Sequence, residues 1–154
     1  MSNLSHSQSI EILGKTGEKI VSNFYSRNGK IVEQSINNFD STKDMLVDGA
    51  KIEVKTQVPF VIKNAFTFRE NQLRKCLNAD GVVFVSVPNT TKPHYSDGKV
   101  YLIDSSKLKY SHYTTKDGRK MILIPIDQPD MIELYQMTEE ECIELQKYTT
   151  SSWK

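Results

Sequence analysis

The sequence has little cysteine, little net charge and no long apolar run. Its 154 residues include two cysteines, Cys76 and Cys142, far apart and in no spacing typical of a metal site. We expect reduced, buried thiols rather than a disulfide framework, with a single disulfide as the alternative. No apolar run approaches membrane-spanning length, and the polar start, MSNLSHSQS, lacks the apolar segment of a signal peptide. We therefore expect a soluble, cytoplasmic protein with no membrane partner.

The charges are almost balanced. The chain has 20 Lys and Arg against 19 Asp and Glu, for a net charge of +1. The overall charge thus indicates neither a nucleic-acid nor a membrane partner, and any electrostatic attraction has to be local. Apolar residues make up 38% and charged residues 25%, which is typical of a globular protein and not of a disordered one. The length, without repeats or linkers, predicts a single domain over residues 1–154.

The apolar pattern predicts a helix, three strands, a second helix and a fourth strand, in that order. The expected helices cover residues 9–27 and 68–79, and the expected strands cover residues 30–36, 44–47, 51–57 and 81–88. Beyond residue 88 we expect strands at 100–104, 110–115 and 120–126. A last helix should begin near Thr138, where TEEE has the spacing of a capping box.

Two carboxylates and a lysine interrupt the apolar pattern of residues 43–57, KDMLVDGAKIEVKTQ. If Asp48-Gly49 is a two-residue hairpin turn, Asp44 lies directly opposite Glu53. Lys55 and Gln57 share that face, since strand side chains alternate. Opposed like charges destabilise a sheet, and a divalent cation such as Mg²⁺ between the carboxylates would offset the repulsion. Lys55 could then hold a water molecule or stabilise negative charge on a phosphate.

Two alternatives remain open for this hairpin. Its polar face could simply be solvated, with Lys55 in a surface ion pair of little energetic value. A bulge at the turn would shift the register by one residue and separate Asp44 from Glu53.

An aspartate opening one strand, a tight turn and Glu-x-Lys on the next strand, all after an N-terminal helix, resemble the PD-(D/E)xK nuclease superfamily. The short chain and the glutamate on its first helix are most similar to archaeal and phage Holliday-junction resolvases and Mrr-type endonuclease domains. The resemblance covers about residues 9–88, and Lys43 replaces the usual proline before the aspartate. It implies a restriction-endonuclease-like α/β (α+β) fold with an αβββαβ core. A mixed central sheet would be flanked by helices, and residues 89–154 would add C-terminal strands and a helix.

The resemblance also implies the site. Asp44 and Glu53 would be metal ligands, with the backbone carbonyl of Val54 as a further ligand, and Lys55 would be the catalytic lysine. Glu18 resembles the helix glutamate that reaches the site in that family, with Glu11 as the alternative.

The resemblance extends to residues around this site. Gln57 would orient water or phosphate, or be an ordinary polar strand end. Gln72 on the second helix resembles a glutamine that some relatives direct at the site. Arg69, Arg74 and Lys75 would contact phosphates, or form the solvated face of that helix.

The function that the resemblance implies is a Mg²⁺-dependent DNA endonuclease that hydrolyses phosphodiester bonds, with Mn²⁺ as a possible substitute. The favoured subtype is a Holliday-junction or branched-DNA resolvase, because the chain has no separate sequence-reading domain. Such an enzyme needs two active sites and hence a homodimer. The alternatives are a nicking, repair or restriction-type nuclease on linear DNA, an RNA endonuclease, and a non-catalytic nucleic-acid-binding module on the same fold.

Overall fold

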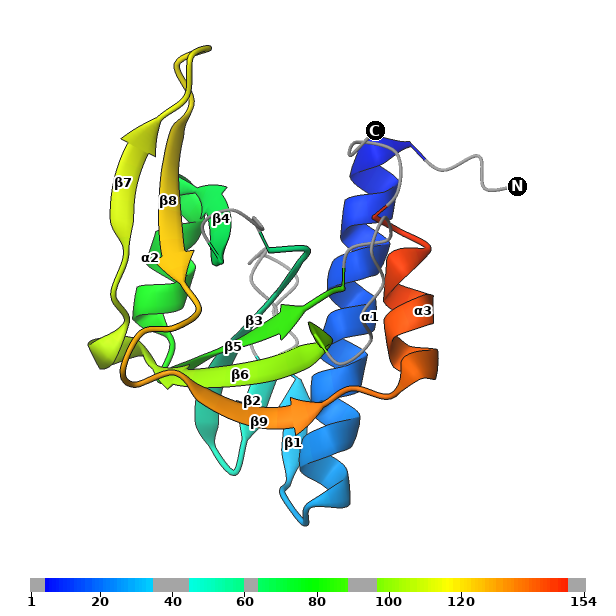
Figure 1. Cartoon of the computed structure of the whole chain (residues 1–154). Helices are drawn as coiled ribbons and strands as arrows, with labels where there is room; N and C mark the ends of the chain where they lie inside the picture. The colour runs from blue at the N-terminus through cyan, green and yellow to red at the C-terminus, as the bar shows by residue number, and fades with distance from the viewer. Residues whose placement is uncertain (1–4, 35–44, 60–63, 89–96, 150–154) are drawn as a thin grey trace.

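The computed structural model of the chain describes residues 5–34, 45–59, 64–88 and 97–149 (Figure 1). These residues form a mixed α/β fold with two sheets. The larger sheet has the strand order β1-β2-β3-β5-β6-β9, and the smaller has the order β4-β8-β7. The predicted class, α/β with a mixed central sheet and flanking helices, is confirmed at this level.

The helices are α1 (His6–Arg27), α2 (Glu70–Asn78) and α3 (Glu139–Gln146). The strands of the larger sheet are β1 (Val32–Gln34), β2 (Met45–Val47), β3 (Ala50–Gln57), β5 (Gly81–Ser86), β6 (Lys99–Asp104) and β9 (Ile132–Gln136). The strands of the smaller sheet are β4 (Ala65–Arg69), β7 (Ser111–Thr114) and β8 (Lys120–Pro125). A short 3₁₀ helix, η2 (Ser105–Lys107), follows β6.

The β2–β3 hairpin has the predicted turn. Asp48 and Gly49 have φ of 49° and 84°, as a type I′ turn requires at both central positions. Val47 pairs with Ala50 and Met45 with Ile52, so the described part of the ladder has the predicted register and no bulge at the turn. β3 then pairs with β5 in parallel, whereas the other neighbouring strands of the larger sheet are antiparallel.

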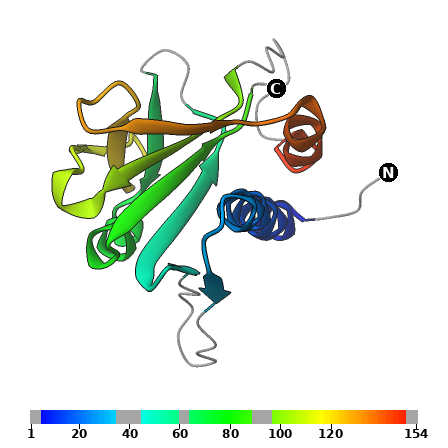
Figure 2. The ribbon, with the colours of Figure 1, turned by 90° about the horizontal axis from the view of Figure 1, so that it is seen from below.

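The larger sheet is covered on both faces. Figure 2 shows α1 and α3 on one side, and α2 with the smaller sheet on the other. Ile52 and Val54 of β3 belong to the first layer, together with Leu13, Val21 and Leu145. The second layer contains Val82 and Phe84 of β5, packed with Phe66, Leu73, Cys76, Ile122 and Ile124. Because side chains alternate along a strand, neighbouring residues of β3 enter different layers.

The structure differs from the predicted element order between β3 and α2. An additional strand, β4, lies there, so the simple αβββαβ order is interrupted, and α2 begins at Glu70 rather than at residue 68. Ala65 and Phe66 are fully buried and β4 pairs with β8 far along the chain. This long-range pairing stabilises the segment as a strand, although its last residues were predicted to begin the helix.

The C-terminal part of the chain contributes strands to both sheets: β7 and β8 belong to the smaller sheet, and β6 and β9 extend the larger one. β6 pairs with β5, and β9, which was not predicted, forms the far edge beside β6. α3 packs beside α1 and begins at Thr138 with the predicted capping box, in which Glu141 N–H donates to Thr138 Oγ1 at 3.1 Å.

Both cysteines are buried thiols that form no disulfide, as predicted. Within the described part of the chain, no helix combines the length and apolar character needed to cross a membrane.

Candidate functional site

Glu53 and Lys55 form an ion pair inside the molecule. Lys55 Nζ lies 3.1 Å from Glu53 Oε1, and the two side chains are only 10% and 12% exposed, respectively. Their ladder partners are Val82 and Phe84, so both side chains extend into the layer shared with α2 and the smaller sheet. The pair is thus not part of a solvated hairpin face. Charges in such an apolar layer are tolerated only when they are paired and hydrogen-bonded.

Helix α2 provides a second partner for the lysine. Lys55 Nζ donates a hydrogen bond to Gln72 Oε1 at 2.6 Å. It also lies 5.8 Å from the ring centroid of Phe68 on β4, a distance at which the ring face attracts a cation. Carboxylate, amide oxygen and aromatic ring together hold the ammonium in one orientation. Gln72 is therefore directed at Lys55, and its predicted role at a nuclease site stays a prediction.

Cys76 lies beside this pair and was not predicted to take part. It is completely buried on α2, and burial raises the pKa of its thiol to about 11, against a smaller lowering effect of Lys55. The thiol is therefore protonated near neutral pH and is not a nucleophile, because the reactive form of cysteine is the thiolate.

Gln57 connects the two sheets. Its Nε2 donates to the carbonyl oxygen of Thr67, and its Oε1 accepts from the N–H of Thr67 at 2.7 Å. The side-chain amide thus pairs with both backbone groups of Thr67, as the backbone of a neighbouring strand would. This is more than an ordinary polar strand end. The predicted role of Gln57 in orienting water or phosphate stays a prediction.

The predicted metal site is only partly described. Asp44 lies outside the described residues, so its position opposite Glu53 stays a prediction. Val54 follows Glu53 in β3, and its side chain packs in the opposite layer. In the described ranges, no group of three or more His, Cys, Asp or Glu side chains could hold a metal ion. The carboxylate of Glu53 and the carbonyl of Val54 supply oxygen ligands, which a hard cation prefers. A complete site would also need Asp44.

Asp48 is at the hairpin tip and has a structural role. Its Oδ1 accepts from the N–H of Ile31 at 2.8 Å, and Lys30 Nζ lies 3.5 Å from Oδ2. The hydrogen bond from Ile31 holds the pKa of this exposed carboxyl below its usual value. Asp48 therefore ties the turn to the segment before β1.

Helix α1 carries the two candidate glutamates, Glu11 and Glu18. It covers the face of β3 opposite to the Lys55 side chain, where Gly17 lies directly against Thr56. Glu11 is exposed and pairs with Lys15 at 3.3 Å. Glu18 is half-buried, and its predicted contact with the site stays a prediction.

The basic residues predicted to contact phosphates are spread from the N-cap of α2 to its last turn. Arg69 occupies the N-cap position and is exposed, Arg74 is exposed, and Lys75 is half-buried. They flank Gln72 along the chain, so the side of the molecule that holds Lys55 also presents cationic groups to solvent.

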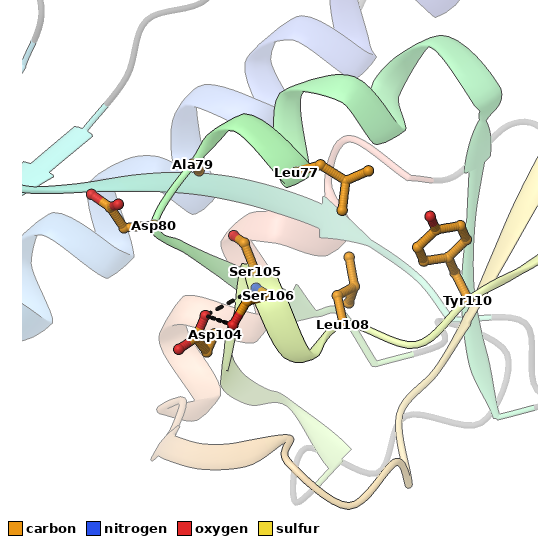
Figure 3. A pocket seen from close by; sticks show the side chains of 8 residues that line it. All are labelled: Leu77, Ala79, Asp80, Asp104, Ser105, Ser106, Leu108 and Tyr110. Atoms are coloured by element: carbon orange, nitrogen blue, oxygen red, sulfur yellow. Dashed lines mark hydrogen bonds between the residues drawn. The ribbon is translucent and has the colours of Figure 1, made fainter.

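A separate shallow pocket of about 420 Å³ opens near the start of β5 (Figure 3). Asp80 Oδ2 accepts from the N–H of Lys51, and Asp104 Oδ1 accepts from the N–H and Oγ of Ser106. Both carboxylates therefore stabilise local backbone. The residues that line this pocket include neither member of the Glu53–Lys55 pair.

Comparisons with protein-family models, with curated proteins and with solved structures find no match to this chain.

Sequence reasoning missed the contributions of Phe68, Thr67 and Cys76. The alternation of Ala65–Arg69, AFTFR, with two phenylalanines at period two, is the signal that could have indicated a strand beside the site.

Proposed function

We propose that this protein is a metal-dependent endonuclease acting on DNA. The observation that carries the proposal is the nearly buried Glu53–Lys55 pair, in which the lysine is also oriented by Gln72. A lysine that is fixed and largely shielded from water suits the stabilisation of negative charge far better than a mobile surface lysine. The described hairpin register, with Met45 opposite Ile52, supports the further expectation that Asp44 comes next to Glu53.

The proposed roles follow from the chemistry of the side chains. Asp44, Glu53 and the Val54 carbonyl would hold Mg²⁺, or Mn²⁺ in its place. The bound ion would supply Lewis-acid polarisation of a phosphate oxygen. Lys55 would position the attacking water or stabilise charge growing on the phosphate. Gln72 would act as a positioning residue, because its amide oxygen sets the direction of the Lys55 ammonium.

The proposal extends to a restriction-endonuclease-like core, although β4 interrupts the expected element order. Its support is the succession of α1, the β2–β3 hairpin, α2 and the parallel strand β5, with α1 and α2 on opposite faces of the sheet. A branched-DNA resolvase acting as a homodimer remains the favoured subtype. A nicking or restriction-type nuclease on linear DNA and an RNA endonuclease are the alternatives within the enzyme class.

One observation favours a different class. Glu53 Oε1 is already engaged by Lys55, and the described ranges contain no cluster of three acidic or other ligating side chains. A non-catalytic nucleic-acid-binding module would keep such a pair as part of its core. This second candidate predicts tight binding without cleavage.

A cleavage panel tests the proposal. The substrates are a four-way junction, a flap, a linear duplex, single-stranded DNA and RNA, each with Mg²⁺, Mn²⁺ or EDTA. We expect metal-dependent cleavage of DNA, with branched forms preferred over linear duplex. Lys55→Ala should remove most turnover while DNA binding persists, because the lysine acts in the transition state. Equal or greater cleavage of RNA contradicts the DNA assignment, and binding without cleavage supports the non-catalytic module.

A further inference from the structure

The β7–β8 hairpin concentrates positive charge in a chain whose total charge is nearly balanced. The segment 107–120, KLKYSHYTTKDGRK, contains five basic residues and a single acidic one, Asp117. All four residues of β7 are exposed. Because the net charge of the chain is only +1, this segment is a local cationic feature and not a consequence of overall composition.

The hairpin projects from the body of the protein. Figure 1 shows β7 and β8 extending past α2 and β4 to an isolated tip. The ladder between β4 and β8 ends at the pair Arg69–Met121, whereas the β7–β8 ladder continues to Thr114–Lys120. From there to the turn, the chain is a two-stranded ribbon. The major groove of DNA is wide enough to admit a two-stranded β-ribbon.

Both ends of the hairpin are held by hydrogen bonds. At the tip, Thr115 N–H donates to Arg119 O at 2.9 Å and Gly118 N–H donates to Thr115 O at 3.0 Å. Gly118 has φ of 87°, which a glycine adopts without strain. At the base, the buried Gln128 accepts from Lys109 N–H at 2.8 Å and donates to Lys109 O at 3.0 Å. The hairpin is thus preorganised, which lowers the entropy cost of binding a partner.

The lysines of the hairpin are not neutralised within the molecule. Among the described residues, no ion pair involves Lys109, Lys116 or Lys120, whereas Arg119 pairs with Asp117 at 3.0 Å. From outside the hairpin, Glu70 of α2 lies 3.3 Å from His112 Nδ1. Three cations therefore remain available to an external polyanion.

We propose that the β7–β8 hairpin is a DNA-binding arm, in which Lys109, Lys116 and Lys120 contact backbone phosphates of duplex DNA. The DNA substrate rests on the proposed function. β8 pairs with β4, whose Phe68 adjoins Lys55, so the arm is built directly onto the site. Phosphates bound along the hairpin would hold the duplex beside the Glu53–Lys55 pair, with the exposed ring of Tyr113 adding contact area.

Binding is measured by fluorescence anisotropy of a labelled duplex and a labelled four-way junction, with the full chain in EDTA so that no cleavage occurs. The test variant combines Lys109→Ala, Lys116→Ala and Lys120→Ala. The control combines Lys15→Ala, Lys19→Ala and Lys147→Ala, which remove the same charge from exposed positions on α1 and beside α3. A third variant replaces the three hairpin lysines by arginine, and melting curves establish that all variants are folded.

We expect the hairpin alanine variant to bind DNA about tenfold or more weakly at 0.1 M salt. The slope of log K against log salt should fall by about 2 to 3, since each phosphate contact contributes about 0.9. The control should change little, and the arginine variant should bind like the wild type. Equal weakening in test and control variants, or no DNA binding by the wild type, would overturn the proposal.

These binding measurements, combined with the cleavage panel, separate this proposal from the nuclease assignment. If the wild type binds DNA through the hairpin but cleaves nothing with Mg²⁺ or Mn²⁺, the DNA-binding arm is supported and the nuclease assignment is contradicted. If the hairpin alanine variant binds and cleaves DNA like the wild type, the nuclease assignment is supported and the DNA-binding arm is contradicted.

Discussion

The Nζ atom of Lys55 donates a 2.6 Å hydrogen bond to Oε1 of Gln72, which joins the middle of β3 to helix α2. The same ammonium lies 3.1 Å from Glu53 Oε1. The orientation of the lysine is therefore set by two elements at once. A change in either partner should alter both the stability of this layer and the direction of the charge.

The ion pair should show strong coupling in unfolding experiments. Lys55→Met keeps much of the side-chain volume but leaves Glu53 without its cation, which should destabilise the protein by about 3 kcal/mol. The double variant Lys55→Met with Glu53→Gln should recover part of that loss, because no uncompensated charge remains. Urea unfolding in EDTA measures the free energy of unfolding of the double variant and of the two single variants, Lys55→Met and Glu53→Gln. Additive effects of the two single changes would mean that the pair is not coupled.

The two aspartates near the β2–β3 turn should differ sharply in their effect on cleavage. Asp44→Asn should abolish metal-dependent cleavage, if Asp44 and Glu53 share a cation. Asp48→Asn should be nearly silent, because Asn-Gly suits a type I′ turn and the new amide oxygen can still accept from Ile31. Cleavage assays and melting curves with and without Mg²⁺ measure both. Loss of activity from Asp48→Asn alone would refute the assignment of Asp44.

The Gln57 amide should contribute to the packing of the smaller sheet against β3. Gln57→Ala removes both hydrogen bonds to the backbone of Thr67, so the half-buried N–H and C=O groups lose their partner. We expect a loss of about 2 kcal/mol in the free energy of unfolding.

A matched control for Gln57 is Gln136→Ala on the edge strand β9. Gln136 is exposed and donates to Gly98 O at 3.2 Å, but that carbonyl also accepts from Met137 N–H. Gln136→Ala should therefore lower the free energy of unfolding much less than Gln57→Ala does. Equal losses from the two variants would contradict a special role for Gln57.

Two glycines of α1 should respond in opposite directions to alanine. A Cβ at Gly17 would lie 1.8 Å from Thr56 Oγ1, whereas a Cβ at Gly14 has no atom within 4 Å. Gly17→Ala should thus push α1 from β3 and destabilise the protein by about 1–3 kcal/mol. Gly14→Ala should stabilise it by up to about 1 kcal/mol, because alanine is the better helix former. Thermal melts compare them, and a stable Gly17→Ala variant would contradict the close packing.

Features that depend on neighbouring residues could be predicted from the amino-acid sequence alone. The Asp48-Gly49 pair predicted the turn and register of the β2–β3 hairpin, and the strand alternation placed Glu53 and Lys55 on one face. The capping box at Thr138 predicted the start of α3. These features follow from backbone conformations and hydrogen bonds within a few residues, so local chemistry suffices to specify them.

The surroundings of Lys55, in contrast, follow from contacts between segments that are distant in the sequence. That β4 is a strand depends on its pairing with β8, more than fifty residues away, because the alternation of AFTFR is only a short local signal, and β9 forms by pairing with β6. The capture of Gln57 by Thr67, the approach of Gln72 to Lys55 and the position of α1 on the opposite face all arise from packing between distant segments. Such contacts depend on burial and long-range pairing, which residue spacing along the chain does not encode.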